Sequence, residues 1–169
     1  ACSLFRKQNR AFRVCIATVL IAVFPLQISE GGTSLSWSEL PQIPNSVGVA
    51  GPFVGVHNNA LIIAGGANFQ PPVWQSEKEW HDEIFVLVRS GNTYLWQETG
   101  TLPRPIAYGA AVSTSDGVVC MGGNDAETTL DQVFLMQWDA AQKKVRLVDY
   151  PSLPGPCAFG SAVVVDNVI

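Results

Sequence analysis

Residues 60–66 read Ala-Leu-Ile-Ile-Ala-Gly-Gly, and residues 118–123 read Val-Val-Cys-Met-Gly-Gly. Both are short apolar runs that end in a pair of glycines. Such runs, when turn residues bound them, are typical of a β-strand buried on both faces. A glycine pair permits backbone with positive φ and close approach of a neighbouring chain. The two stretches therefore predict the same buried strand in two copies of one all-β unit.

The similarity continues on both sides of these runs. A strand and a polar turn come before each of them, and a loop of variable length, a second apolar strand and a last, more polar strand come after. Leu-Pro pairs at 40–41, 102–103 and 153–154 separate the units. A repeat of about 50 to 60 residues with four strands per unit is the pattern of a β-propeller blade. The expected strands are 53–57, 60–64, 84–88 and 93–96 in the first unit, and 108–113, 118–121, 133–137 and 145–148 in the second.

These boundaries predict a partial propeller over residues 31–169. It comprises a lone outer strand at 34–39, a blade at 40–101, a second blade at 102–152, and the start of a third at 153–169. Phe159 to Val165 is expected to open the third blade, with a turn at Asp166-Asn167. Because the chain opens on Ala1 and stops at Ile169 within an apolar run, we expect it to be a fragment of a longer protein.

Residues 1–30 differ in composition from the rest. Four basic residues between Arg6 and Arg13 precede an uncharged run at 14–24, which is the order of a secretory signal peptide. The run is much shorter than the ~20 residues of a membrane-spanning helix. We expect cleavage between Ser29 and Ser34 and a periplasmic or extracellular protein; a retained signal-anchor is the alternative.

Charge and cysteine content narrow the partners. The chain has 10 basic and 14 acidic residues, and four of the basic ones lie in the predicted signal peptide. An acidic mature chain without a basic cluster argues against nucleic acid as a partner. Cys2 and Cys15 also lie in the signal region, which leaves Cys120 and Cys157; buried free thiols are favoured over a disulfide between them.

The order of strand, turn, strand, Gly-Gly and distal Trp resembles the kelch repeat. Within that class, residues 65–69, 72–74 and 78–87 resemble the first blade of the cyclically permuted mutarotase family, relatives of bacterial N-acetylneuraminate epimerase. Arg104, Tyr108-Gly109 and 113–123 resemble the second blade. Residues 70–72 and 75–77 depart from the family pattern, because Gln-Ser-Glu stands at 75–77 where glycines are expected.

This resemblance implies a six-bladed kelch propeller that interconverts the α and β anomers of a sialic acid such as N-acetylneuraminate. It implies an isomerase with no metal and no organic cofactor, and a small-molecule sugar as the partner. Anomer exchange needs a base for the anomeric hydroxyl and an acid for the ring oxygen. The carboxylate of a sialic acid would also need a fixed cation, for which arginine is well suited.

Arg104 is the candidate carboxylate clamp, with a surface ion pair as the alternative interpretation. His81, with Asp82 or Glu79 beside it, is the candidate acid–base group on a loop expected at 67–82; a structural histidine is the alternative. His57 is expected to be structural. The candidate catalytic residues are Arg104, His81 and Asp82, and the candidate substrate-binding residues are Asn68, Lys78, Tyr108, Asn124 and Asp125.

Two other functions remain open at this stage. A kelch propeller can serve as a non-catalytic module that binds carbohydrate or protein, because one fold hosts many functions. Kelch blades also occur in copper-radical oxidases of the galactose oxidase kind, but the Tyr, His and Cys ligands of such a site are not visible here. Two histidines and two separated cysteines match no zinc pattern, and no phosphate-binding loop is present.

Overall fold

The computed structural model describes residues 35–166, 168 and 169. The predicted signal peptide, its cleavage region, Cys2, Cys15, the first residue of the expected outer strand and Asn167 lie outside the described residues. The chain divides into Ala1–Trp37 and Ser38–Ile169, and the strands of the described residues lie in the second unit. In the described part, no helix is long and apolar enough to cross a bilayer.

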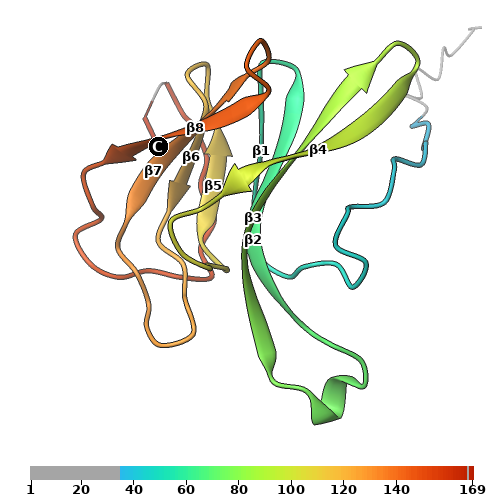
Figure 1. Cartoon of the computed structure of the whole chain (residues 1–169). Coiled ribbons are helices and arrows are strands. Elements are labelled where there is room, and N and C mark those ends of the chain that lie inside the picture. The colour runs from blue at the N-terminus through green and yellow to red at the C-terminus, as the bar shows by residue number, and fades with distance from the viewer. Residues whose placement is uncertain (1–34, 167) are drawn as a thin grey trace, which may run out of the picture. The chain divides into compact units, whose positions relative to one another are not determined.

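The second unit contains two four-stranded antiparallel sheets, ordered β1-β2-β3-β4 and β5-β6-β7-β8 (Figure 1). Each sheet is a meander in chain order, and the two repeat the same arrangement, so the all-β propeller prediction is confirmed. The bounds are β1 Phe53–His57, β2 Ala60–Phe69, β3 Lys78–Ser90, β4 Thr93–Thr101, β5 Ala110–Ser113, β6 Val118–Met121, β7 Val133–Asp139 and β8 Lys144–Tyr150, with one 3₁₀ turn, η1, at Val73–Gln75.

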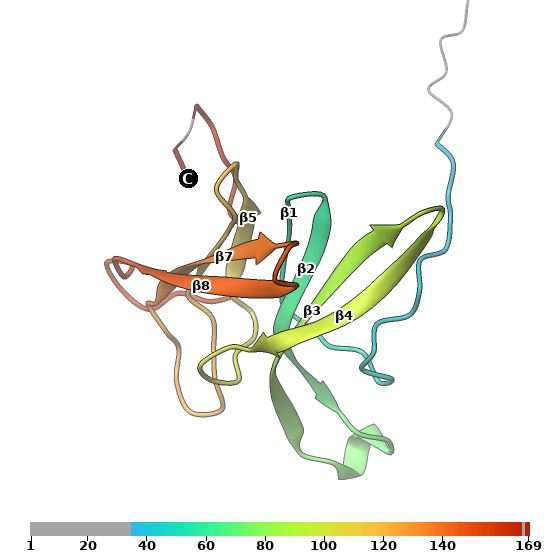
Figure 2. The ribbon, with the colours of Figure 1, turned by 45° about the horizontal axis from the view of Figure 1, so that its top comes forward.

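A loop expected at 67–82 is mostly strand. β2 continues to Phe69 and β3 begins at Lys78, so the two form a hairpin arm that leaves only residues 70–77 as its tip (Figures 1 and 2). The ladder shifts register between Ala64 and Gly66, where Gly65 has φ +68°. A bulge with a left-handed glycine bends a ladder without ending it. The glycine pair therefore redirects the hairpin, whereas the sequence analysis took it as the end of the strand.

The two blades are joined by backbone hydrogen bonds that repeat from blade to blade. The N–H of Gly66 donates to the carbonyl of Ile106 at 2.8 Å, and the N–H of Gly123 donates to that of Cys157 at 2.8 Å. In both cases the second glycine of the pair reaches the linker that leads into the next blade. A Cβ on the first glycine of each pair, Gly65 or Gly122, would clash with the same carbonyl oxygen, so a side chain there would prevent so close an approach of two backbones.

The hydrophobic core lies between the sheets and includes buried residues from both. Phe53 of β1 is fully buried and meets Phe134 of β7 edge to face, with ring centroids 5.3 Å apart. Ile62, Val86, Val118 and Met136 are also fully buried in the same cluster. Since these residues come from alternate strand positions that face the neighbouring sheet, each blade completes the other's core.

His57 joins the blades at the far end of the strands from the glycine pairs. Its Nδ1 accepts the N–H of Trp138 at 2.9 Å, and the side-chain amide of Asn58 donates to the carbonyl of Trp138 at 2.9 Å. Both backbone polar groups of Trp138, at the end of β7, thus have a side-chain partner at the β1–β2 turn. This contact gives His57 a structural part.

The expected strands at the two ends are not formed. Residues 35–43 have no regular secondary structure, so the outer strand expected at 34–39 is not seen, and residues 159–164 form no strand either. Val165 and Val168 make only an isolated bridge. A strand needs neighbouring strands to satisfy its N–H and C=O groups, and neither segment belongs to a sheet in the described part of the chain.

The two described cysteines are free, and they differ in environment. Cys120 on β6 is fully buried in the core, whereas Cys157 is exposed, contrary to the expectation of two buried thiols. Burial raises the pKa of the Cys120 thiol, because the thiolate would lose its hydration. Cys120 therefore behaves as an apolar core residue.

Candidate functional site

A cleft of about 420 Å³ lies at the end of the blades that carries the glycine pairs. One wall is the β2–β3 arm of the first blade, and the other is the loop after Gly122-Gly123 in the second. The cleft gathers four of the predicted substrate-binding residues: Lys78, Tyr108, Asn124 and Asp125. Its remaining lining residues are Trp80, Ala126, Glu127, Thr128, Thr129 and Phe159.

Lys78 and Trp80 come from the first residues of β3 and share a face of the arm, because side chains alternate along a strand. The Lys78 Nζ lies 4.7 Å from the centroid of the Trp80 ring and 4.5 Å from that of Tyr108. The faces of these rings attract a cation. The ammonium group is thus held at the cleft by two rings from different blades.

Tyr108 occupies a backbone position that occurs three times. Gly51, Tyr108 and Phe159 have φ values of +61°, +63° and +59°. Gly51 and Tyr108 lie two residues before β1 and β5, and Phe159 lies at the equivalent place in the third unit. The N–H of Tyr108 donates to the carbonyl of Gly51 at 2.7 Å, and the N–H of Phe159 donates to that of Tyr108 at 2.7 Å. The chain of bonds therefore steps from blade to blade through this position.

Phe159 is a residue of the cleft that the sequence analysis did not select. Its ring stacks on that of Tyr108, with centroids 4.8 Å apart and planes at 26°, and it is 74% exposed. The signal was the repetition of an aromatic residue before glycine, Tyr108-Gly109 and Phe159-Gly160. An exposed ring stacked on a half-buried one, beside polar side chains, is suited to the apolar face of a sugar ring.

Arg104, the predicted clamp, is already engaged. Its Nη1 lies 3.2 Å from Asp125 Oδ2, and its side chain is 50% exposed. The first blade has a similar contact. Asn68 follows Gly66 by two residues, as Asp125 follows Gly123, and its Nδ2 lies 3.4 Å from Oδ1 of Asn45 in the preceding linker. Because both blades tie linker to hairpin at this place, Arg104 has a structural partner that a substrate would have to displace.

Asp125 is fixed chiefly by the backbone. Its Oδ1 accepts the N–H groups of Glu127 at 2.9 Å and Thr128 at 2.8 Å, which with the nearby Arg104 lower the pKa of the carboxyl. A lowered pKa in the folded state means that the charged form stabilises the fold above the unfolded-state pKa. That contribution is lost as the pH falls through the folded-state value.

We therefore expect acidification to act partly through Asp125. In full-length protein, Asp125→Asn should show a smaller fall in Tm between pH 7 and about pH 3 than wild type, because the amide oxygen still accepts both N–H groups but does not titrate. Asp125→Ala, which loses the acceptor, should lower Tm at both pH values. Differential scanning calorimetry measures both, and an unchanged pH dependence in Asp125→Asn would contradict the expectation.

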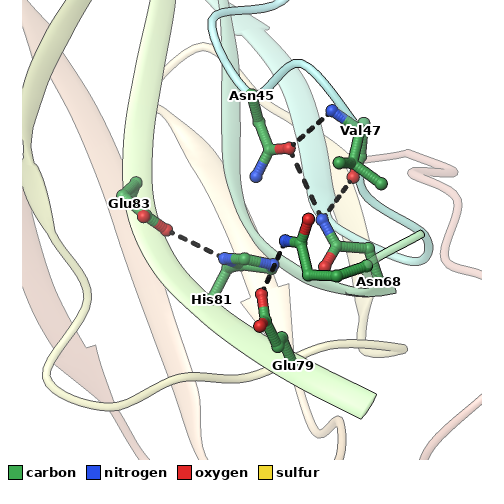
Figure 3. Close-up of polar contacts among 8 residues, drawn as sticks. Asn45, Val47, Asn68, Glu79, His81 and Glu83 are labelled. Atoms are coloured by element: carbon green, nitrogen blue, oxygen red, sulfur yellow. Dashed lines mark hydrogen bonds and ion pairs between the residues drawn. The ribbon is translucent and has the colours of Figure 1, made fainter. Parts of the chain in front are cut away.

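The candidate acid–base group lies on the other face of the arm. His81 shares that face with Asn68, Glu79 and Glu83, and its Nδ1 is 3.5 Å from Glu83 Oε2 (Figure 3). Glu79 instead accepts a hydrogen bond from the side chain of Gln70 at 2.7 Å. The structure therefore separates His81 and Asn68 from the cleft that holds Lys78.

Asp82 is not paired with His81 as the sequence analysis allowed, because neighbours in a strand point to opposite faces. The carbonyl of Asp82 accepts the N–H of Leu102 at 2.7 Å, and the carbonyl of Asp131 accepts that of Leu153 at 2.8 Å. The backbone carbonyl of an equivalent aspartate thus anchors the Leu-Pro linker in each of the two blades. Asp82 occupies a repeated structural position.

Asn68 also supports the linker, since its Nδ2 donates to the carbonyl of Gly48 at 2.8 Å. Its Oδ1 and the Nε2 of His81 are buried and have no hydrogen-bond partner among the described residues.

A larger groove of about 820 Å³ at the opposite end of the strands contains none of the predicted site residues. No described group of three or more His, Cys, Asp or Glu residues is placed to hold a metal ion.

Comparison with known proteins identifies the family of the chain. The family model described as N-acetylneuraminate epimerase matches residues 25–145, more than half of the chain. The chain belongs to this family. An N-acetylneuraminate epimerase of Yersinia enterocolitica is 32% identical over 114 residues, which cover 57% of this chain and 28% of that protein. One of Brucella suis is 33% identical over 117 residues, which cover 60% and 29%.

The fold is also similar to a solved structure titled "Structure of YjhT", with a TM-score of 0.61 and 25% sequence identity. That likeness covers 70% of this chain and 36% of the solved chain. The chain spans less than a third of the length of the curated relatives it matches.

Proposed function

We propose that the protein is an exported mutarotase that interconverts the α and β anomers of a sialic acid such as N-acetylneuraminate. Membership of the epimerase family supports the sugar class. The observation that carries the proposal is the cleft between the two blades, where a lysine, two threonines, two half-buried aromatic rings and the exposed ring of Phe159 face one space. Sugar sites combine apolar ring faces with a few placed polar groups in this way.

The proposed reaction breaks and remakes one bond. A base takes the proton of the anomeric hydroxyl, an acid protonates the ring oxygen, and the ring C–O bond opens to the keto form. Closure on the other face of the carbonyl reverses both proton transfers. The part of the chain described here would bind and orient the sugar in the cleft. The predicted acid–base groups, His81 and Asp82, do not line this cleft.

Export is part of the proposal and rests on the order of charged, apolar and polar residues in 1–30. Expression of the full-length protein with cell fractionation and N-terminal sequencing tests it. We expect a mature N-terminus between Ser29 and Ser34. Recovery of the uncleaved chain in the membrane fraction would support the signal-anchor instead.

We expect the full-length protein to speed anomer exchange of N-acetylneuraminate, followed by NMR from a sample enriched in one anomer. Thr128→Trp should slow this exchange by filling the cleft, because the new side chain leaves the Thr128 N–H to Asp125 in place. Gln142→Trp is the matched control, since its N–H donates to Asp139 in a similar exposed turn at the far end. No acceleration by wild type would contradict the mutarotase and favour a binding propeller.

A further inference from the structure

We infer that Lys78, and not Arg104, binds the carboxylate of the sugar, with the Trp80 and Tyr108 rings holding its ammonium group toward the cleft. This inference rests on the proposed function. It names the residue that selects an anionic sugar over a neutral one. Three observations lead to it: the pairing of Arg104, the position of Lys78 and the rings around the cleft.

The first observation concerns charge balance. Arg104 forms an ion pair with Asp125, so the charge of Arg104 is compensated within the protein. Asp125 is further held by two backbone N–H groups. A substrate carboxylate at Arg104 would have to compete with a fixed anion 3.2 Å away. That competition makes Arg104 a residue that positions the loop wall.

The second observation is that Lys78 has no carboxylate within ion-pair distance in the described part of the chain. Its side chain is partly buried, and its contacts at the cleft are the two rings at 4.5 and 4.7 Å. Rings compensate a cation only in part, because they offer a quadrupole and no formal charge. An ammonium group with aromatic neighbours can therefore still take an anionic ligand.

The third observation concerns what lies next to the cation. Tyr108 stacks on Phe159, and Trp80 meets Tyr108 edge to face with centroids 5.9 Å apart. The three rings come from the arm, the second blade and the start of the third, so ligand contact depends on the assembled blades. Lys78 is close enough to these rings for one sugar to meet both the charge and an apolar surface.

The test compares an acid with its neutral ester. We expect the full-length wild type to exchange the anomers of N-acetylneuraminate with a higher kcat/KM than those of its methyl ester. Lys78→Met should lower kcat/KM for the acid about tenfold to a hundredfold, the range for losing a hydrogen bond to a charged group. The ester should be unaffected, because methionine keeps the length and the aromatic contacts of the side chain.

Lys144→Met is the matched control, since Lys144 is exposed at the opposite end of the blades. It should leave both substrates unchanged. Arg104→Ala should lower kcat/KM for the acid and for the ester by the same factor, because Arg104 only positions the loop. The inference would be overturned if Arg104→Ala lowered kcat/KM for the acid alone, or if Lys78→Met lowered kcat/KM for acid and ester equally. Either result would leave the proposed mutarotase activity standing. No exchange of either substrate by wild type would overturn the proposed function itself.

Discussion

Gly65→Ala is expected to lower the free energy of unfolding by about 3–5 kcal/mol, at the upper end of single substitutions. Gly65 has φ +68°, and a Cβ there would clash with the carbonyl oxygen of Ile106. That oxygen accepts the N–H of Gly66 across the blade interface, so it cannot retreat without loss of the bond. The His81 carbonyl at 3.3 Å blocks a shift in another direction.

Gly91→Ala separates backbone strain from the clash. Gly91 has φ +62°, close to that of Gly65, but nothing lies within 4 Å of the added Cβ. We expect this control to cost only the about 1–2 kcal/mol of a left-handed alanine. Urea unfolding of the full-length variants gives the difference. Equal losses for the two would show that the approach of Ile106 is not what requires a glycine at position 65.

The strands could be predicted where pattern and packing agree. β1 and β6 have the bounds that the sequence indicates, because each is a short apolar run between turn residues. The β2–β3 arm could not be predicted, since Gly65-Gly66 is equally compatible with the end of a strand and with a bulge within one. Only the continued pairing of β2 with β3 beyond the glycines, as far as the pair Phe69 and Lys78, decides between them.

The candidate site was predictable in composition but not in arrangement. Lys78, Tyr108, Asn124 and Asp125 do line one cleft. Sequence order could not reveal that Lys78 and His81 face opposite sides of the arm, because the strand containing both was taken for a loop. It also could not reveal that Arg104 forms an ion pair with Asp125, because that contact joins a linker to the loop that follows β6.

Phe53→Ala should also lower the free energy of unfolding by about 3–5 kcal/mol, the usual range for a buried phenylalanine. Phe53 is fully buried on β1, yet its ring contacts residues of the second blade. It meets Phe134 edge to face, and it packs so closely on Gly109 that a Cβ there would clash with the ring. The cavity would therefore open at the blade interface.

Phe159→Ala is the matched control for this change, because it removes the same ring from a side chain that is 74% exposed. We expect it to change Tm little, since an exposed ring gains little from folding. If the blades depend on each other's core, Phe53→Ala should also increase hydrogen exchange at β6 and β7, on the neighbouring sheet. Increased exchange confined to β1 and β2 would show instead that each blade is stable by itself. The cleft between the blades, and with it the placement of Lys78 against Tyr108, would then not depend on this core.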